Sequence, residues 1–466
     1  MNESMTSPLP RTSTGVQHIA GKITGLVAGL LLVTLLVSCP TTGIIQEIDY
    51  EQGTYHLYVP DTYSPDTSRV MVVVHGTPGG GEDVVSLAES FIKRWVSFAE
   101  ETQSVIVAPA FDRENFASDT GAYGGYRNLH GREVGADEFL HSILNNVMIR
   151  APVTEDRFFL YGHSAGGQFA ARYLVRHPQR LLGVVLSAPG RYPFPDPEAE
   201  WGYGMARSHR VIEWPDGEQQ EIDVRPDPDG WDRATGIPVH VVIGDEDTSC
   251  QPCRPAHCED DAHCGFHADS TTRIQIGKKW VADMQALAES GGRAGRAHIQ
   301  LISGVGHNSA ALTNHCQKVL RYLLDGRIMV PDVVGKYKLK AMEMLESIPL
   351  QGRIGEGSFS DRPKGEVVRQ LPEAGDWVGK GSGVVITPSL EEEPPPSRTT
   401  VPNVVGQTLI EARSVIHAAG YTPVTVFVDS DQPFDQVVGQ KPPGGDHAAP
   451  GNEVRLFVSK GQGDLK

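Results

Sequence analysis

Short, unbroken runs of apolar residues recur through the first two thirds of the chain, and they constrain the fold more than any other feature. These runs are residues 69–74, 104–107, 158–161, 182–186, 239–243 and 299–302. A strand that is apolar along its whole length must be buried on both faces, as in a parallel sheet covered by helices. Segments with helical periodicity lie between the runs, at residues 137–148, 168–176 and 276–289. This alternation predicts a doubly wound, mostly parallel α/β domain over residues 46–327.

One of these runs leads into a glycine-rich turn that indicates nucleophilic catalysis. After residues 158–161 the chain reads Gly162-His163-Ser164-Ala165-Gly166-Gly167, and helical signals begin at once. In the pattern Gly-x-Ser-x-Gly between a strand and a helix, the serine sits on a strained turn where flanking side chains would collide. We therefore predict that Ser164 is a nucleophile. A serine-containing turn without a catalytic role is the alternative.

Acidic residues follow a later apolar run. The segment 239–243 leads into Gly244-Asp245-Glu246-Asp247 at the same edge of the predicted sheet as Ser164. A carboxylate there would hold a histidine in the tautomer that accepts the serine proton, and it would stabilise the imidazolium as it forms. All three acids are candidates on this ground alone.

A histidine follows the last apolar run through a Gly-rich turn. This residue, His307, completes the chain order serine, acid, histidine that the predicted fold requires of a catalytic triad. His298 lies within the predicted strand and His315 within the following helical segment, so both fit the role of general base less well.

On these motifs, residues 46–327 resemble the α/β-hydrolase superfamily. The spacing Gly-x-x-Asp that is common in this family selects Asp247 as the acid, with Asp245 and Glu246 as the alternatives. The resemblance implies catalysis by Ser164, His307 and Asp247 without a metal or an organic cofactor.

The same resemblance implies an oxyanion hole made of two backbone N–H groups. Thr77 follows His75-Gly76 at the end of an early strand, where the family places one donor. Pro78 has no N–H, so the second donor is expected to be Ala165, directly after the nucleophile. The His75 side chain is expected to hold the turn.

The substrate is suggested only by a narrower resemblance. Residues 162–169 and 191–196 are similar to the secreted esterase and polyhydroxybutyrate-depolymerase-like branch, which implies a carboxylesterase-like enzyme acting on a small-molecule or polymeric ester. A Cys/His-rich segment after Asp247 and a candidate lid at residues 201–231 depart from that branch. A peptidase or acyltransferase using the same triad is the alternative, as is an inert hydrolase fold in a cell-wall-binding scaffold.

The last third of the chain contains an internal repeat with a period of about seventy residues. Residues 330–335 recur as residues 401–406, and residues 367–372 recur as residues 437–442. Each copy also has a short helical segment, at residues 339–345 and 409–418.

The opening Val-Pro-x-Val-x-Gly, the Gln-x-Pro turn and the closing apolar strand of both copies resemble PASTA repeats. The resemblance implies two small α+β modules at residues 329–389 and 400–461, and contact with peptidoglycan. A pair of stalk modules that only set a distance from the membrane is the alternative. The Glu- and Pro-rich residues 390–399 predict an extended linker between the modules.

Residues 1–38 are predicted to be a targeting segment. The apolar run at residues 23–37 is shorter than the roughly twenty residues that a spanning helix needs, and it fits a signal-peptide core. Leu36-Val37-Ser38-Cys39 resembles the bacterial lipobox, which implies a lipid on Cys39 and an extracytoplasmic protein anchored in the cell envelope. An uncleaved anchor helix is the alternative.

The remaining cysteines are Cys250, Cys253, Cys258, Cys264 and Cys316. Outside the cytoplasm disulfides are favoured, and a bridge from Cys316 to the cluster, with Cys250 as the preferred partner, would tie together the loops after Asp247 and His307. A zinc site formed by the cluster and nearby histidines is the alternative. A nucleic-acid partner is not expected, because the formal net charge is −17 and no Lys/Arg cluster stands out.

Overall fold

The computed structural model describes residues 40–79, 82–117, 125–248, 272–390 and 399–461. The first part of this structure is built on an eight-stranded sheet in the order β1-β2-β4-β3-β5-β6-β9-β10. Its strands are β1 (Ile45–Tyr50), β2 (Gly53–Tyr58), β3 (Arg69–Val74), β4 (Ser104–Ala110), β5 (Phe158–His163), β6 (Leu181–Ser187), β9 (Val239–Gly244) and β10 (Ala297–Ile302). The strands from β4 to β10 in that order run parallel, whereas β1 and β2 pair antiparallel. The predicted mostly parallel α/β fold is therefore confirmed.

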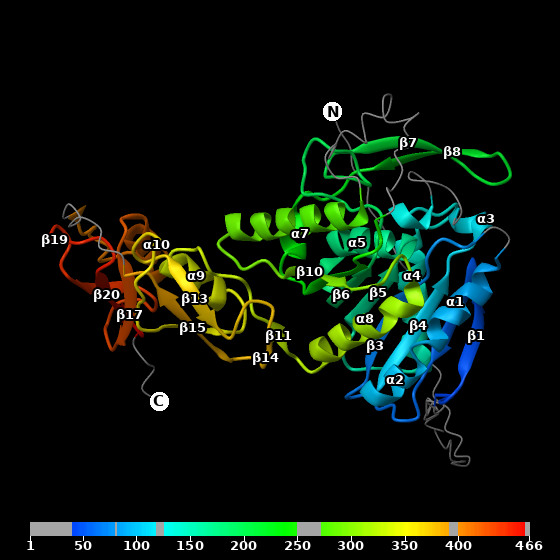
Figure 1. Cartoon of the computed structure of the whole chain (residues 1–466), viewed down its shortest axis with the longest axis horizontal. Coiled ribbons are helices and arrows are strands. Elements are labelled where there is room, and N and C mark those ends of the chain that lie inside the picture. Colours follow the sequence, from blue (N-terminus) through cyan, green and yellow to red (C-terminus); the bar gives the residue numbers. More distant parts are fainter. Residues whose placement is uncertain (1–39, 80–81, 118–124, 249–271, 391–398, 462–466) are drawn as a thin grey trace, which may run out of the picture. The chain divides into compact units, whose positions relative to one another are not determined.

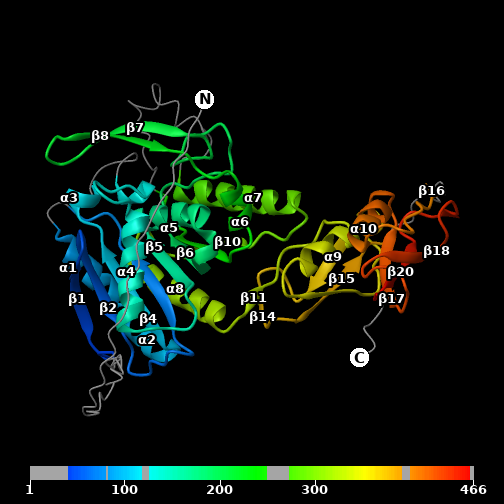
Figure 2. The same ribbon diagram turned by 180° about the vertical axis from the view of Figure 1, so that it is seen from behind.

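Helices cover the two faces of this sheet (Figures 1 and 2). They are α1 (Val84–Lys93), α2 (Val96–Thr102), α3 (Arg113–Phe116), α4 (Ala136–Arg150), α5 (Ala165–Arg176), α6 (Asp229–Ala234), α7 (Arg273–Ser290) and α8 (Ser309–Leu324), with short 3-10 turns at Tyr126–Asn128 and Pro178–Arg180. Each of the six apolar runs in the sequence lies in a strand of the sheet. Five of these strands are largely buried, as in a sheet covered on both faces, whereas residues 299–302 lie in the edge strand β10, where Gln300 and Leu301 are exposed. Among the described residues, no helix is both long and apolar enough to cross a bilayer.

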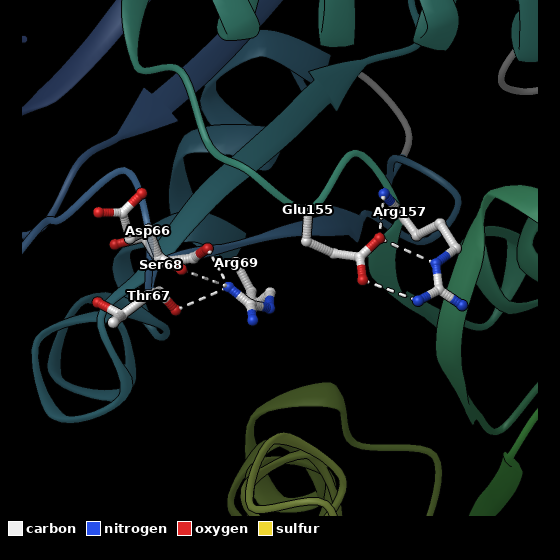
Figure 3. A network of polar contacts seen from close by, with 6 residues as sticks. All are labelled: Asp66, Thr67, Ser68, Arg69, Glu155 and Arg157. Atoms are coloured by element: carbon white, nitrogen blue, oxygen red, sulfur yellow. Dashed lines mark hydrogen bonds and ion pairs between the residues drawn. The ribbon is translucent and has the colours of Figure 1, made fainter. Parts of the chain in front are cut away.

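Two arginines fix the amino ends of the central strands, at the edge of the sheet away from the carboxyl ends (Figure 3). Arg69, the first residue of β3, donates to the carbonyl oxygens of Thr67 and Ser68 at 3.0 and 2.9 Å. Arg157, just before β5, makes a two-pronged ion pair with Glu155 at 2.9 and 2.7 Å. These contacts stabilise the turns that precede β3 and β5, at the opposite edge of the sheet from the carboxyl ends of these strands.

A two-stranded hairpin stands apart from the main sheet, within the segment predicted as a candidate lid (Figure 1). It consists of β7 (Ser208–Glu213) and β8 (Gln219–Val224), which pair antiparallel. Its turn end, at Trp214, belongs to a small apolar cluster that also contains Ala117, and Arg132 lies over the Trp214 ring.

The last third of the chain forms two modules with the same topology. In the first, α9 (Lys338–Glu346) accompanies a sheet in the order β12-β15-β13, with β12 at Gln351–Ile354, β13 at Val367–Leu371 and β15 at Gly383–Pro388. In the second, α10 (Leu409–Ala418) accompanies the order β17-β20-β18, with β17 at Thr422–Val428, β18 at Val437–Lys441 and β20 at Glu453–Ser459. Short pairs complete the modules, β11 (Ile328–Met329) with β14 (Trp377–Val378) and β16 (Thr399–Thr400) with β19 (His447–Ala448). The helical segments predicted at residues 339–345 and 409–418 are confirmed.

The repeated glutamine explains why both modules keep the same sequence marks. The Gln370 side chain accepts a hydrogen bond from the Val333 N–H at 2.8 Å and donates to the Pro331 carbonyl at 2.8 Å. Gln440 makes the same pair of bonds to the Val404 N–H and the Pro402 carbonyl, at 2.7 and 2.9 Å. One amide thus ties the opening Val-Pro-x-Val segment to an edge strand of the module, β13 or β18, and satisfies backbone groups that the fold removes from water.

We expect Gln440→Ala to leave the Val404 N–H without its partner and to destabilise the second module by about 1–3 kcal/mol. Hydrogen–deuterium exchange of the full-length protein should then become faster in peptides that contain Val404. Gln432→Ala, at an exposed position of the same module, is the control and should leave the exchange unchanged. Equal protection of Val404 in both variants would show that the amide bond does not hold the segment.

Candidate active site

The turn between β5 and α5 places Ser164 at the carboxyl edge of the sheet in a strained conformation. Ser164 has φ 53° and ψ −110°, outside the usual regions for a residue with a side chain. Its N–H donates to the Ser187 carbonyl of β6 at 2.8 Å. A Cβ built on Gly162 would lie 2.1 Å from the Gly166 oxygen, and one built on Gly166 would lie 2.4 Å from the Val74 oxygen. Only glycine fits at these two positions, so the turn has the geometry of a nucleophile elbow.

The structure brings Ser164 and His307 together. His307 Nε2 lies 3.0 Å from Ser164 Oγ, although the two residues are far apart in the sequence. His307 follows β10 through a tight turn in which Gly304 has a φ of 72°. The distance is within hydrogen-bond reach of a general base and its nucleophile.

The acid nearest to His307 is Asp247. Its Oδ2 lies 2.7 Å from His307 Nδ1, and its side chain is buried. Parallel pairing sets Ile302 beside Gly244, so the turns after β9 and β10 begin at the same level of the sheet. This register explains how Asp247 and His307 meet.

The two alternative acids have other positions. The Asp245 carboxylate accepts a hydrogen bond from the Gly304 N–H at 2.8 Å, and it thereby supports the turn that presents His307. The Glu246 side chain is exposed. Of the three acids in the turn, Asp247 is the one in contact with the imidazole.

The two predicted oxyanion donors lie on either side of Ser164. Ala165 is the first residue of α5, and the N–H groups at the start of a helix have no partner within that helix. A Cβ built on Gly76 would lie 3.5 Å from the Ser164 Cβ, which places the turn that contains Thr77 next to the nucleophile. Thr77 Oγ1 accepts a hydrogen bond from Arg127 at 2.8 Å.

A buried histidine holds the turn before Thr77. His75 Nδ1 lies 2.7 Å from the Gly76 carbonyl, and the Phe111 N–H donates to His75 Nε2 at 3.1 Å. One ring nitrogen therefore donates and the other accepts, as in a neutral imidazole. Burial lowers the pKa of His75 to about 4, in keeping with the neutral form. The Tyr126 hydroxyl also donates to the Gly76 carbonyl, at 3.1 Å.

Comparison with known proteins assigns the two parts of the chain to families. Residues 69–213 match the alpha/beta hydrolase fold, and residues 328–389 and 399–460 each match the PASTA domain. The chain combines an α/β-hydrolase fold with two PASTA domains. The match to the hydrolase model includes the elbow but ends before Asp247 and His307.

The curated relatives share only part of this chain. A probable serine/threonine-protein kinase of Streptomyces coelicolor is 27% identical over 136 residues, which are 29% of this chain and 20% of the kinase. Serine/threonine-protein kinase PrkC of Bacillus subtilis is 30% identical over 142 residues, which are 30% of this chain and 21% of PrkC. The chain thus spans about a fifth of the length of these relatives.

Solved structures with similarity to the chain include two bacterial hydrolases. The poly(3-hydroxybutyrate) depolymerase LpqC of Bordetella parapertussis is 23% identical, with a TM-score of 0.48, and the match covers 63% of this chain and 92% of LpqC. Poly(aspartic acid) hydrolase-1 of Sphingomonas sp. KT-1 is 19% identical, with a TM-score of 0.47, and the match covers 60% of this chain and 100% of that protein.

A second histidine of the hydrolase domain lies against the base. The His163 ring centroid is 4.9 Å from that of His307, and His163 Nδ1 lies 2.9 Å from the Ser187 hydroxyl. Burial, reinforced by the neighbouring His307, lowers the pKa of His163 to about 3. His163 is therefore an uncharged side chain that packs against His307.

One further contact, between Asp247 and Arg273, could not be predicted from the sequence. Arg273 Nη1 donates to Asp247 Oδ1 at 2.7 Å, in a buried ion pair. Burial raises the pKa of the Asp247 carboxyl, but the hydrogen bond from His307 and the charge of Arg273 outweigh it and hold that pKa below its ordinary value. The sequence shows only that a basic residue begins the helical segment after the acid loop. This observation does not distinguish Arg273 from other arginines.

The predicted disulfide of Cys316 is wrong. Cys316 is a free thiol, fully buried on α8, and burial raises its pKa to about 12. It lies on the apolar face of the helix with Leu312 and Leu320, so it points into the core.

Several predicted features lie outside the described residues. These are the lipidated Cys39 with the segment before it, the cysteines Cys250, Cys253, Cys258 and Cys264 with their zinc alternative, and most of the linker at residues 390–399. Within the part that the structure describes, no group of three or more Asp, Glu, His or Cys side chains is arranged to hold a metal ion.

Proposed function

We propose that this chain is a serine hydrolase that cleaves carboxylic esters through Ser164, His307 and Asp247. The single observation that carries the proposal is the contact of His307 with both partners, at 3.0 Å to Ser164 Oγ and 2.7 Å to Asp247 Oδ2. The strained elbow supports it, because a turn without a catalytic role gains nothing from holding a serine at positive φ.

In the first half of the proposed reaction, Ser164 Oγ attacks the carbonyl carbon of the ester while His307 Nε2 takes the hydroxyl proton. The new oxyanion accepts hydrogen bonds from the N–H groups of Thr77 and Ala165. The protonated His307 then donates to the departing alcohol oxygen, which leaves an acyl group on Ser164.

In the second half, water replaces the alcohol. His307 removes a proton from the water as it attacks the acyl carbonyl, and the same proton returns to Ser164 Oγ as the acid is released. Asp247 keeps Nδ1 of His307 protonated and stabilises the imidazolium in both halves. The reaction draws on these side chains and backbone groups alone.

The first test removes the members of the proposed triad one at a time. Ser164→Ala and His307→Ala should each lower kcat by about 10⁵-fold or more, because triad members act as a unit. Asp247→Asn should cost about 10⁴-fold, since it disturbs the tautomer and the imidazolium but not the nucleophile. Glu246→Gln, in the same turn, is the matched control and should keep its activity.

Hydrolysis of 4-nitrophenyl esters of increasing chain length, beside aminoacyl anilides, measures these effects. Preference for an anilide would indicate a peptidase, and transfer of the acyl group to an added alcohol would indicate an acyltransferase. Full esterase activity in Ser164→Ala would refute the mechanism. Loss of activity in Asp245→Asn but not in Asp247→Asn would reassign the acid and leave the rest intact.

We also propose that the enzyme works at the cell wall outside the cytoplasm. The PASTA resemblance supports contact of residues 329–389 and 400–461 with peptidoglycan, and we propose residues 46–327 as the catalytic domain and residues 390–399 as the linker. Full-length protein should then co-sediment with purified cell-wall sacculi, whereas a chain that ends at residue 327 should stay in the supernatant with its esterase activity. Equal sedimentation of the two would favour the stalk alternative.

Anchoring by a lipid on Cys39 is a further part of the proposal. The lipobox-like sequence at residues 36–39 supports it, and residues 1–38 would be removed as a signal peptide. The N-terminal peptide of the mature protein should carry a diacylglyceryl mass, and Cys39→Ala should release the protein from membranes or stall its processing. A cleaved protein that still partitions into membranes without Cys39 would argue against the lipid.

A further inference from the structure

The carboxylate of Asp247 is shared between a base and a cation. Its Oδ2 faces His307 Nδ1, and its Oδ1 accepts from Arg273 Nη1, with both distances at 2.7 Å. The side chains of Asp247 and Arg273 are 1% and 9% exposed. One carboxylate oxygen is therefore committed to each neighbour.

The charge of this carboxylate needs a partner in the resting enzyme. A general base must be neutral before the reaction, so His307 supplies a hydrogen bond but no positive charge at that stage. An ionised carboxylate that is buried without an opposite charge is costly, and it would tend to take up a proton. Arg273 supplies the opposite charge.

The position of Arg273 is unfavourable for the helix that carries it. Arg273 is the first residue of α7, where the helix dipole disfavours a positive charge, and the first turn contains no acidic residue. Thr272 and Gln275 form a capping box that fixes where α7 begins. The pairing with Asp247 accounts for an arginine that the helix itself does not favour.

The packing of α7 holds this position firmly. A Cβ built on Gly277 would lie 3.1 Å from the Ile243 side chain of β9 and 3.1 Å from the Tyr192 hydroxyl. The Tyr192 ring stacks on Trp280 of α7 at 5.0 Å. Because α7 packs this closely on the strand that ends before Asp247, Arg273 and the acid are fixed on the same framework.

Among the described residues, few other titratable or charged groups lie around the pair. Tyr192 interacts with both members, and its burial keeps the phenol protonated by raising its pKa. His163, beside His307, is neutral, and Arg94 at the end of α1 acts on His163. Of these groups, Arg273 is the cation that bonds directly to the acid.

From this arrangement we infer that Arg273 is a positioning residue of the active site, which orients the Asp247 carboxylate toward His307 and keeps it ionised while His307 is neutral. Arg273 touches neither Ser164 nor the reacting carbonyl, so it acts through Asp247. The positive charge of Arg273 also disfavours the imidazolium that forms on His307. The arginine therefore improves the orientation of the acid but makes His307 a weaker base. This inference rests on the proposed function.

Three substitutions separate the orienting effect from the charge. Arg273→Ala should lower kcat by about tenfold to a hundredfold, because the carboxylate loses the bond that fixes Oδ1. It should also move the acidic limb of the kcat/KM profile to higher pH by about half a unit or more, because His307 and Asp247 both hold protons more readily without the nearby cation. Arg273→Lys keeps the positive charge, so it should leave the acidic limb in place while it lowers kcat. Arg273→Gln removes the charge but can still donate a hydrogen bond, so it should shift the limb and lower kcat less than Arg273→Ala does.

Arg293→Ala is the matched control. Arg293 forms an exposed ion pair with Asp232 in the same domain, away from the triad, so its removal should change neither kcat nor the pH profile. Rates are referred to active sites titrated with a fluorophosphonate, which corrects for any variant that folds in lower yield.

The outcomes distinguish this inference from the proposed function. A wild-type protein that neither hydrolyses esters nor reacts with the fluorophosphonate would refute the function before any variant is measured. An active wild type in which all three Arg273 variants keep kcat per titrated site and an unshifted acidic limb would overturn the role of Arg273. Variants that differ only in the fraction of folded protein would also overturn it, because a purely structural residue does not move the pH profile.

Discussion

The close approach of backbones at the nucleophile elbow is the constraint on which the proposed site depends. Gly166 lies against the carbonyls of Val74, the last residue of β3, and of His75, which follows it, with a built Cβ only 2.4 and 2.5 Å from these oxygens. Because neither backbone can retreat from a fully buried sheet, the start of α5 is fixed relative to β3. This places Ser164, the N–H of Ala165 and the turn that contains Thr77 close together in the folded chain, so the proposed oxyanion site would need little rearrangement when a substrate binds.

The parallel register of β9 and β10 determines how the remaining groups meet Ser164. Both turns leave the sheet at one level, and Asp245 connects them through the Gly304 N–H. Three acids in one short turn thereby take different positions. Asp245 supports the histidine loop, Glu246 faces solvent, and Asp247 contacts the imidazole and an arginine. The difference arises from the direction of each side chain, since the three positions are adjacent in the chain.

Local patterns were sufficient to predict the parallel strands and to pick out Ser164 and His307 as candidates, whereas the choice of Asp247 among three acids came from the spacing of a known family. A buried parallel strand must be apolar along its length, and a nucleophile elbow needs glycine, so both leave marks in a few consecutive residues. The hairpin of β7 and β8 was not predicted as strands, because most of its residues face solvent and lack an apolar run. The pairing of Arg273 with Asp247 was also missed, since it depends on where α7 packs and not on any local pattern.

The error at Cys316 has a similar origin. Its closeness to His307 in the sequence suggested a bridge between loops, but Cys316 is already two turns into α8. In a helix the phase of a residue decides which way it points, and Leu312 and Leu320, four residues away on either side, mark the buried face. The helical period therefore predicts the direction of the Cys316 side chain better than its nearness to His307 in the sequence does.

The repeated motif of the two PASTA domains accounts for their shared fold but not for their surfaces. Gln370 is buried and Gln440 is half-buried, and their bonds to the Val-Pro segments serve the fold of each module. The exposed aromatic residues differ between the modules, with Tyr337 and Phe359 in the first and Phe427 and Phe434 in the second. Since the shared contacts hold each module together and the surfaces differ, the motif identifies the scaffold, and the proposed contact with the cell wall would depend on surface residues that the two modules do not share. The two modules therefore need not bind alike, even though they fold alike.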